Sequence, residues 1–347
     1  MTPAERARGL RRERVRASKL NVDGMFRNPS GAGPGIKGNP LPLFGDFLFG
    51  RPGRRPPGVV PVESPQPVWS RPVETGLRVT WLGHSTVLLE LDGRRVLTDP
   101  VFGERVSPVS FAGPRRFHAT PCTLDELPPL DAVLVSHDHF DHLCATSVAT
   151  LARRGVPFVT PLGVGEWLVR YGVPAEQVTE LEWGESADVG GVQFVATPCQ
   201  HFSGRGLLSR NKTLWASWVM RGSRHSVFFS GDTGLTTDFQ ATGRDYGPFD
   251  LVMLEVGAFH EAWGSIHLGP KNALTAFDWL GGGTLMPVHW GTFDLALHGW
   301  DDPVEQLVQL AAAGGQRVLT PPLGRPFEVS QVSRFEPWWR AVRGLGV

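Results

Sequence analysis

The chain has 347 residues, of which 41% are hydrophobic, so it can bury a core large enough for one large domain or two ordinary ones. Its 34 lysines and arginines balance its 34 aspartates and glutamates, which argues against nonspecific nucleic-acid binding as the main function. The odd set of cysteines, Cys122, Cys144 and Cys199, has no paired spacing and indicates free thiols in a reducing compartment.

The N-terminal part of the chain differs in amino-acid composition from the rest. Residues 1–30 carry many arginines with little apolar periodicity, and residues 31–74 are rich in Gly and Pro around an apolar island at 41–49. We expect residues 1–75 to form an irregular N-terminal extension that wraps on a main domain of residues 76–347. The apolar island either packs on that domain or forms a lip for a lipid substrate.

From residue 76 onward, short runs of β-favouring residues alternate with turns. The predicted strands are 78–83, 85–91, 94–100, 132–137, 192–198, 214–220, 226–232, 251–257, 284–290 and 317–322. So many strands require more than one sheet.

Helical periodicity interrupts the strands in four places, at 145–154, 165–171, 270–280 and 303–313. The last two have Pro in the first turn and Gly beyond the end, where each residue is tolerated best. This order of elements favours a layered α/β protein in which two sheets pack together under outer helices.

The most informative stretch is 132–143, where a short apolar strand ends in three histidines and two aspartates. They form the pattern H-x-H-x-D-H with His137, His139, Asp141 and His142. Such a group of polar residues is not expected in a hydrophobic core, and a solvated polar loop rarely has this spacing directly after a strand. Imidazole and carboxylate together suit borderline divalent ions such as zinc.

Further candidate ligands follow later strands: His201, Asp232 and His289 each come soon after an apolar run and before small or turn residues. Taken singly, each residue fits an ordinary structural role as a hydrogen-bonded His, a turn residue or a helix cap. The presence of H-x-H-x-D-H upstream favours the metal-ligand interpretation for all three.

These residues resemble those of the metallo-β-lactamase superfamily of binuclear hydrolases, and within it the N-acylphosphatidylethanolamine-hydrolysing phospholipase D family and its bacterial relatives. The stretches that carry the resemblance are 76–87, 97–102, 113–117, 126–143, 228–234, 246–251 and 288–296, with a fainter match at 23–29. The resemblance implies an α/β fold, a four-layer αβ/βα sandwich with metals at one edge between its two sheets.

The same resemblance implies a ligand set for two divalent metal ions. His137, His139 and His201 match the ligands of one metal, Asp141, His142 and His289 match those of the other, and Asp232 matches the bridging carboxylate. The mixed set accepts zinc, which we expect, as well as iron or manganese. Two such ions can bind and deprotonate a shared water and neutralise charge on the group it attacks.

Three other residues have candidate roles near the metals. Asp99 matches a superfamily position that orients a histidine ligand, although it could also be a turn residue before a proline. His267 resembles the family's active-site histidine outside the metal shell, where it could protonate a leaving alkoxide, or it is an ordinary loop residue. His84 is either a buried hydrogen-bonded residue or part of the site.

The implied function is a binuclear metal-dependent hydrolase, with Asp141, Asp232 and His267 as catalytic residues. We expect a phosphodiesterase of phospholipase D type that uses a metal-bridging hydroxide on N-acyl phosphatidylethanolamine or similar glycerophosphodiesters. A lactonase or general small-molecule metallo-hydrolase of the same fold is the first alternative, and a metal-binding module without turnover is the second. The complete ligand set favours an enzyme over such a module.

The expected partner is a small-molecule or lipid phosphodiester, with no nucleic acid. Arg115 and Arg116 either hold a phosphate or lipid head group or form a solvated surface pair, and with the apolar island they suggest peripheral membrane contact. No apolar run reaches the length of a membrane span, and no apolar core follows the arginine-rich start. We therefore expect a cytoplasmic protein, peripheral to the membrane at most.

Overall fold

The computed structural model describes residues 3–35, 53–109, 111–260 and 263–344. Within these residues, seven strands form a first sheet in the order β15-β3-β4-β5-β6-β7-β8. Their bounds are β3 (Leu77–Gly83), β4 (Thr86–Leu91), β5 (Arg94–Thr98), β6 (Ala132–Leu134), β7 (Phe158–Pro161), β8 (Val178–Leu181) and β15 (Phe327–Glu328). β5 to β8 run parallel, and β15, β3, β4 and β5 pair antiparallel.

A second sheet, six-stranded in the described part of the chain, has the order β14-β13-β12-β11-β10-β9. It contains β9 (Ser186–Val189), β10 (Val192–Thr197), β11 (Ser217–Arg221), β12 (Ser226–Phe229), β13 (Leu251–Glu255) and β14 (Leu285–Val288). β12, β13 and β14 are parallel, so their carboxyl ends meet at one edge of the sheet.

Adjacent residues of the central strands pack into different cores. Leu89 of β4 belongs to the large cluster that includes second-sheet residues such as Phe194, whereas its neighbour Leu88 belongs to a cluster with Val148 and Leu168. Successive side chains of a strand point to opposite faces, so both faces of the first sheet are covered. This explains why the sequence of these strands is apolar throughout instead of alternating.

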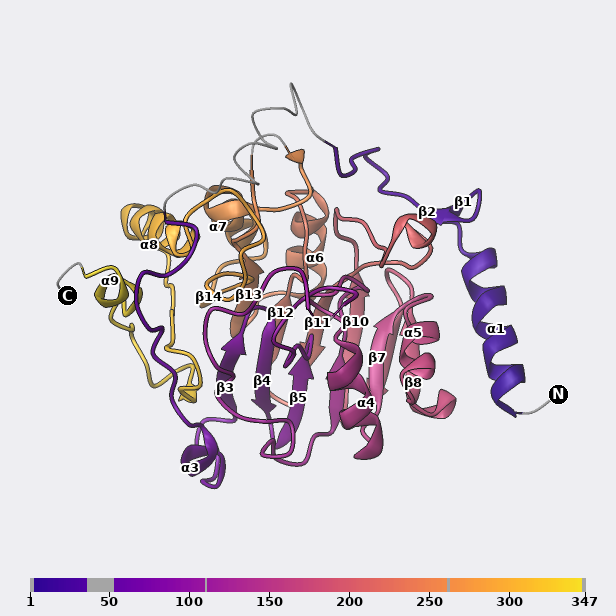
Figure 1. Cartoon of the computed structure of the whole chain (residues 1–347), viewed down its shortest axis with the longest axis horizontal. Coiled ribbons are helices and arrows are strands. Elements are labelled where there is room, and N and C mark those ends of the chain that lie inside the picture. The colour runs from indigo at the N-terminus through magenta and orange to yellow at the C-terminus, as the bar shows by residue number, and fades with distance from the viewer. Residues whose placement is uncertain (1–2, 36–52, 110, 261–262, 345–347) are drawn as a thin grey trace.

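Helices form the two outer layers of the sandwich (Figure 1). α4 (Ala145–Arg153) and α5 (Gly165–Arg170) cover the outer face of the first sheet, because their buried residues belong to the cluster that contains Leu88. On the other side lie α6 (Asp238–Tyr246), α7 (Gly269–Trp279) and α8 (Asp302–Gly314), which supply apolar residues to the large cluster. The chain therefore has the expected α/β sandwich of four layers.

Several shorter elements complete the described chain. They are α1 (Pro3–Ala17), β1 (Asn21–Val22), β2 (Met25–Phe26), α3 (Gln66–Trp69), α9 (Trp339–Val342) and the 3-10 turns η1 (Ala175–Gln177) and η2 (Leu207–Ser209). β1 and β2 form a small antiparallel pair of their own.

The expectation that the whole N-terminal extension is irregular is wrong for α1. Arg, Glu, Ala and Leu give this segment a high helix propensity, but it lacks the apolar stripe that would reveal a helix. Figure 1 shows α1 beside α5, where its arginines find acceptors. Arg14 bonds to the Glu180 carbonyl at 2.8 Å and to the Glu185 carboxylate at 2.6 Å.

Other differences concern individual strands. The predicted strand at 317–322 makes a single isolated bridge, between Val318 and Leu285, because two prolines at its end cannot donate ladder hydrogen bonds. The short strands β7, β8, β9 and β15 and helix α6 were not predicted. The apolar island at 41–49 lies outside the described residues.

The three cysteines are free, as expected. Among the described helices, none is long and apolar enough to span a membrane.

Candidate metal centre

The candidate ligands gather where strands of both sheets end. His137 follows β6 of the first sheet, whereas His201, Asp232 and His289 follow β10, β12 and β14 of the second. The loop after β6 turns back at once, with the His142 amide bonding to the His139 carbonyl at 3.1 Å. This turn brings the second half of H-x-H-x-D-H beside the first half. All seven predicted ligands therefore lie together, and their role as ligands remains a prediction.

Three imidazoles form the first cluster. His139 Nδ1 lies 2.8 Å from His137 Nε2 and 3.3 Å from His201 Nε2. With Asp232, one ligand atom from each of these residues lies within 4.8 Å of all the others. Such a group of inward-facing nitrogens and a carboxylate oxygen could hold a metal ion.

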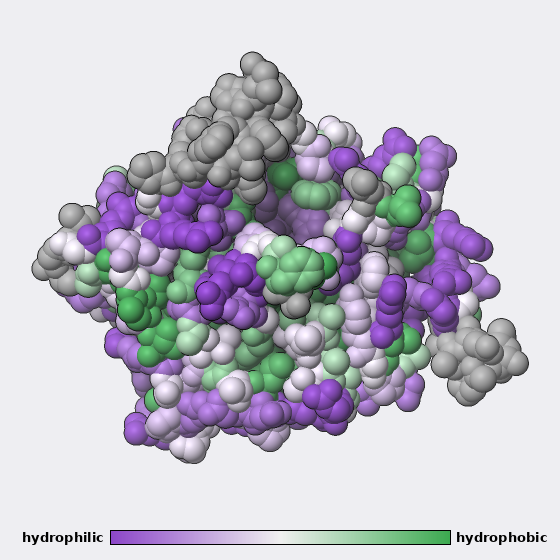
Figure 2. All heavy atoms as spheres, in the orientation of Figure 1, coloured by the Kyte–Doolittle hydropathy of each residue, from purple (hydrophilic) through white to green (hydrophobic). Residues whose placement is uncertain are grey.

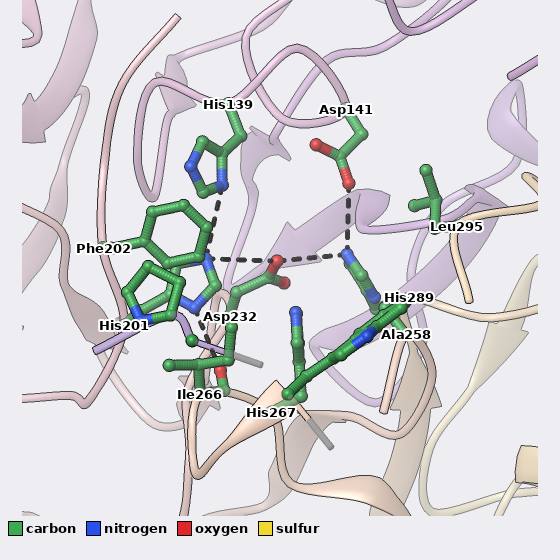
Figure 3. Close-up of a pocket in the computed structure, with 13 residues that line it drawn as sticks. His139, Asp141, His201, Phe202, Asp232, Ala258, Ile266, His267, His289 and Leu295 are labelled. Carbon is green, nitrogen blue, oxygen red and sulfur yellow. Dashed lines mark hydrogen bonds and ion pairs between the residues drawn. The ribbon is translucent and has the colours of Figure 1, made fainter. Parts of the chain in front are cut away.

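The second cluster combines carboxylate and imidazole. Asp141 Oδ2 lies 3.3 Å from His289 Nε2 and 3.6 Å from His142 Nε2. Asp232 Oδ2 lies 3.2 Å from each of these two nitrogens and 3.7 Å from His201 Nε2 in the first cluster. Figure 3 shows Asp232 between His201 and His289. The Asp232 carboxylate thus has the position of a group shared by two ions.

Neighbouring acceptors fix the orientation of the histidine rings. His142 Nδ1 lies 2.7 Å from the buried Asp99 carboxylate, and His201 Nδ1 lies 3.0 Å from the Ile266 carbonyl. When each ring is neutral, its outer nitrogen carries the proton and donates a hydrogen bond to this acceptor, so its inner nitrogen can offer a lone pair to a metal ion. Asp99 therefore has the geometry expected of a residue that orients a ligand.

The charges of the centre favour bound cations. Burial alone would lower the pKa of His142, but the carboxylates of Asp232, Asp141 and Asp99 outweigh it and raise that pKa well above its ordinary value. The same balance, with Asp232 as the largest favourable partner, raises the pKa of His289 to about 10. A metal ion would replace the protons that these carboxylates attract.

Buried polar atoms without partners give a direct test of whether a metal fits. His142 Nε2 and Asp232 Oδ1 are buried and make no hydrogen bond to the rest of the described protein. An unpaired buried polar atom is costly. His142 Nε2 lies 3.2 Å from Asp232 Oδ2, so a cation bound by these two side chains would compensate their burial. The mixture of nitrogen and oxygen donors fits zinc, iron or manganese.

Three residues around the centre have left-handed backbone conformations although they are not glycines. The φ angles are 54° for His84, 34° for Asp99 and 62° for His289. Such conformations cost on the order of 1–3 kcal/mol each and persist where the surrounding structure enforces them. Their concentration here is typical of a functional site.

A cavity of about 440 Å³ opens on the centre. Its polar lining residues are His139, Asp141, His201, Asp232, His267 and His289, and its apolar ones are Pro34, Phe202, Ala258, Trp263, Ile266 and Leu295. The close-up in Figure 3 shows Phe202, Ile266 and Leu295 around the ligand side chains. The cavity therefore offers space for a substrate with a polar reacting group and an apolar part.

His267 and His84 both contact the ligand clusters. A ring atom of His267 lies within 4.8 Å of ligand atoms of Asp232 and His289, and its side chain is 11% exposed. His84 is buried and its Nε2 lies 3.1 Å from Asp141 Oδ2. Burial lowers the pKa of His84 to about 3, so a neutral His84 can donate a hydrogen bond to the Asp141 carboxylate.

Two residues near the centre were missed by the sequence analysis. Glu255, fully buried at the end of β13, lies 3.2 Å from His267 Nδ1. Asn28, in the N-terminal segment, bonds to the backbone of His201. The signal for Glu255 was a lone charged residue in the apolar strand LVMLE, and the signal for Asn28 was the weak resemblance at 23–29.

The two arginines expected at the surface are placed differently from each other. Arg115 is exposed and forms an ion pair with Glu104 at 2.5 Å. Arg116 turns inward, donates a hydrogen bond to the Val101 carbonyl and lies 4.9 Å from the centre of the Phe293 ring. Burial lowers the pKa of Arg116 to about 10. The pair therefore does not present two adjacent cations to a surface ligand.

A sandwich with histidine and aspartate clusters at the shared edge of two sheets defines a metallo-hydrolase of the β-lactamase superfamily. The model of the β-lactamase superfamily domain matches residues 94–290, which include all seven candidate ligands. The chain belongs to the metallo-β-lactamase superfamily and is a metal-dependent hydrolase of that superfamily.

Two relatives show the resemblance over longer stretches. An uncharacterized protein of Mycobacterium tuberculosis is 47% identical over 290 residues, which cover 82% of this chain and 77% of that protein. The N-acyl-phosphatidylethanolamine-hydrolyzing phospholipase D 1 of Caenorhabditis elegans is 38% identical over 234 residues, which cover 64% of this chain and 66% of that enzyme.

Solved structures share the fold at lower identity. A metallo hydrolase from Ignicoccus hospitalis matches with a TM-score of 0.56 and 24% identity, over 73% of this chain and 98% of that one. An isothiocyanate hydrolase from Delia radicum gut bacteria matches with a TM-score of 0.58 and 21% identity, over 72% of this chain and 98% of that one.

Proposed function

We propose that the chain binds two divalent metal ions, with zinc as the expected metal, and hydrolyses phosphodiesters. N-acyl phosphatidylethanolamine or a similar glycerophosphodiester is the proposed substrate class, cleaved in the manner of a phospholipase D. The observation that carries this proposal is the position of Asp232, whose Oδ2 lies 3.2 Å from His289 Nε2 and 3.7 Å from His201 Nε2. One carboxylate shared by two clusters is the arrangement that a two-metal hydrolase requires.

When bound, two divalent ions supply an activated water and neutralise negative charge on the phosphoryl group. The chain's own residues hold that centre in a fixed geometry, because Asp99 and the Ile266 carbonyl orient His142 and His201. The remaining task is to protonate the alkoxide that leaves phosphorus. His267 lines the cavity beside the clusters and can hold a proton at the ring nitrogen that faces the site.

The walls of the cavity support a substrate with an apolar part. Phe202, Trp263, Ile266 and Leu295 line the cavity together with the polar residues. A cavity of about 440 Å³ is large enough for the phosphate and its immediate substituents, so long acyl chains would have to extend beyond it. The phospholipase D named in C. elegans acts on a lipid of this kind, which supports the proposal for the present chain.

A lipid substrate requires contact with a lipid surface, and we include such contact in the proposal. Leu208 and Phe111 are 96% and 81% exposed. Figure 2 shows hydrophobic residues in small separate groups among hydrophilic ones on the viewed face. Burying these two side chains would contribute about 3–6 kcal/mol before the cost of association, so the expected binding is weak and reversible.

The experiment is a substrate panel measured on the zinc-loaded protein, with a soluble phosphodiester, dispersed N-acyl phosphatidylethanolamine, a lactone and a β-lactam. Hydrolysis of both phosphodiesters, lost in Asp232→Asn, is the expected result. Hydrolysis of the soluble phosphodiester alone, without binding to vesicles, would reject the lipid substrate and retain the phosphodiesterase. Hydrolysis of the lactone alone would reject both the lipid substrate and the phosphodiesterase activity.

A further inference from the structure

Glu255 is a buried carboxylate that lies near the candidate metal centre but is not one of its candidate ligands. It ends β13 and is fully buried. Its Oε1 accepts a hydrogen bond from the Leu268 amide at 2.7 Å and lies 3.2 Å from His267 Nδ1, with the Thr233 amide more distant at 3.5 Å. Its Oε2 is buried without a partner in the described part of the protein.

Among the described residues, His267 is the ionisable group that pairs with Glu255. A buried carboxylate is costly unless a cation or a strong donor compensates it. The His267 ring therefore turns Nδ1 toward Glu255, and Nε2 lies on the opposite side of the ring. The ring itself lines the cavity and lies 5.5 Å, between ring centres, from the candidate ligand His289.

We propose that Glu255 is a positioning residue that holds the proton of His267 on Nδ1 and keeps Nε2 directed at the leaving-group oxygen of the substrate. This inference rests on the proposed function and extends it. In the step concerned, a hydroxide formed when water gives up a proton to solvent bonds to phosphorus, and the bond from phosphorus to the alkoxide oxygen breaks. His267 begins the step protonated on both ring nitrogens, gives its Nε2 proton to that oxygen and is left neutral, with its remaining proton on Nδ1 hydrogen-bonded to Glu255.

A purely structural role for Glu255 is the competing explanation. Its bond to the Leu268 amide lies at the start of α7 and could serve only to anchor that helix. The two roles differ in their dependence on the leaving group. Proton donation matters for a poor alkoxide leaving group and little for nitrophenolate, whereas a distorted site would slow both substrates equally.

The kinetic experiment compares glycerophosphoethanolamine with methyl 4-nitrophenyl phosphate in the zinc-loaded protein. Glu255→Leu should lower kcat on the alkyl ester about 10- to 100-fold, and His267→Ala about 10²- to 10⁴-fold. Both variants should slow the nitrophenyl ester at least about 10-fold less than they slow the alkyl ester. In the His267→Ala background, Glu255→Leu should have no further effect on the alkyl ester.

Equal losses on the two esters, or a loss that multiplies with that of His267→Ala, would overturn the positioning role. Glu255→Gln keeps an oxygen that accepts from Nδ1 but carries no charge, so it should recover part of the activity. Glu255→Gln also provides the test if Glu255→Leu does not fold. Glu90→Gln is the matched control, because Glu90 is equally buried but pairs with Arg78 in the first sheet. It should leave the ratio of the two rates unchanged.

A second measurement does not depend on substrate. Two-bond ¹H–¹⁵N correlation spectra of histidine side chains report which ring nitrogen carries the proton, and His267→Gln assigns the signal. The parent protein should show His267 protonated on Nδ1, and Glu255→Leu should show the other tautomer or a mixture. A neutral His267 that carries its single proton on Nε2 in the parent protein would overturn the inference. If neither ester is hydrolysed, the proposed function fails while this spectrum still decides the orientation of His267.

Discussion

The side-chain amide of Asn28 hydrogen bonds to both backbone polar groups of His201, 173 residues further along the chain. Asn28 Nδ2 donates to the His201 carbonyl at 2.6 Å, and the His201 amide donates to Asn28 Oδ1 at 3.2 Å. Asn28 is 7% exposed, so water does not compete for these bonds. The N-terminal segment thus fixes the backbone of a candidate metal ligand, and Pro34 of the same segment lines the cavity.

Asn28→Ala should therefore weaken metal binding although Asn28 is not a ligand. Loss of the two bonds leaves buried backbone groups unpaired, which should cost about 1–3 kcal/mol of stability, and zinc affinity should fall about 10- to 100-fold. Competition with a coloured chelator measures the affinity. Ser30→Ala is the control, because Ser30 bonds to the Gln200 side chain instead of a ligand residue. Equal affinities in the two variants would contradict the role of Asn28.

Asp99→Asn should affect one metal position more than the other. Asp99 Oδ1 already accepts from the Ser136 amide at 2.7 Å, so the new NH₂ group would face His142 Nδ1 and could not accept its proton. His142 would lose its orienting partner, and metal affinity at its cluster should fall about 10- to 100-fold. Metal analysis after dialysis should give about one ion per chain instead of two. Retention of two ions would show that Asp99 does not orient a ligand.

Metal uptake should release protons. The carboxylates of the centre raise the pKa of His142 well above its ordinary value and that of His289 to about 10, so both imidazoles hold protons at neutral pH. Metal binding needs the neutral rings, so zinc affinity should rise with pH from about 6.5 toward 10. The metal-free protein should lose stability over the same interval, because groups with raised pKa stabilise the fold below that interval.

Calorimetric titration of zinc in buffers with different ionisation enthalpies measures the protons released at pH 7. About one to two protons per chain are expected, and fewer in His289→Ala. Uptake without proton release would show that the metal-free centre does not hold these protons.

Asp232→Asn should abolish turnover while the fold is retained. A neutral amide bridges two cations poorly, so the activated water loses its place between them. The loss in kcat should be at least about 10³-fold, and the circular dichroism spectrum should match that of the parent protein. Asp238→Asn is a suitable control, since Asp238 begins α6 and accepts a hydrogen bond from Thr236, which is not a candidate ligand. Near-normal activity in Asp232→Asn would mean that another group takes the shared position.

The sequence predicted best those features that depend on residues close together in the chain. H-x-H-x-D-H lies in one turn after β6, so the spacing of His137 and His142 itself brings their side chains together. The distant partners His201, Asp232 and His289 came from the family resemblance, because the order of strands in two sheets decides their convergence. Apolar runs such as those of β3 and β4 were recognisable because both faces of the first sheet are buried.

Other structural features could not be predicted from neighbouring residues in the sequence. α1 has few apolar residues, and its ion pairs are with residues about 150 positions later, such as Glu166. β9 has the sequence SADV, in which Asp and Ala are uncommon in strands, so its sequence resembles that of a loop. Glu255 and Asn28 become informative only when their partners, His267 and His201, are placed beside them in space.

We claim that phosphodiester hydrolysis by this protein depends on two metal ions held around Asp232. The most direct test is a titration of the metal-free protein with zinc in which bound metal and hydrolysis of methyl 4-nitrophenyl phosphate are followed together. Activity should rise mainly with the second equivalent and reach a plateau at two ions per chain. A plateau at one ion, or two bound ions with no hydrolysis, would contradict the claim.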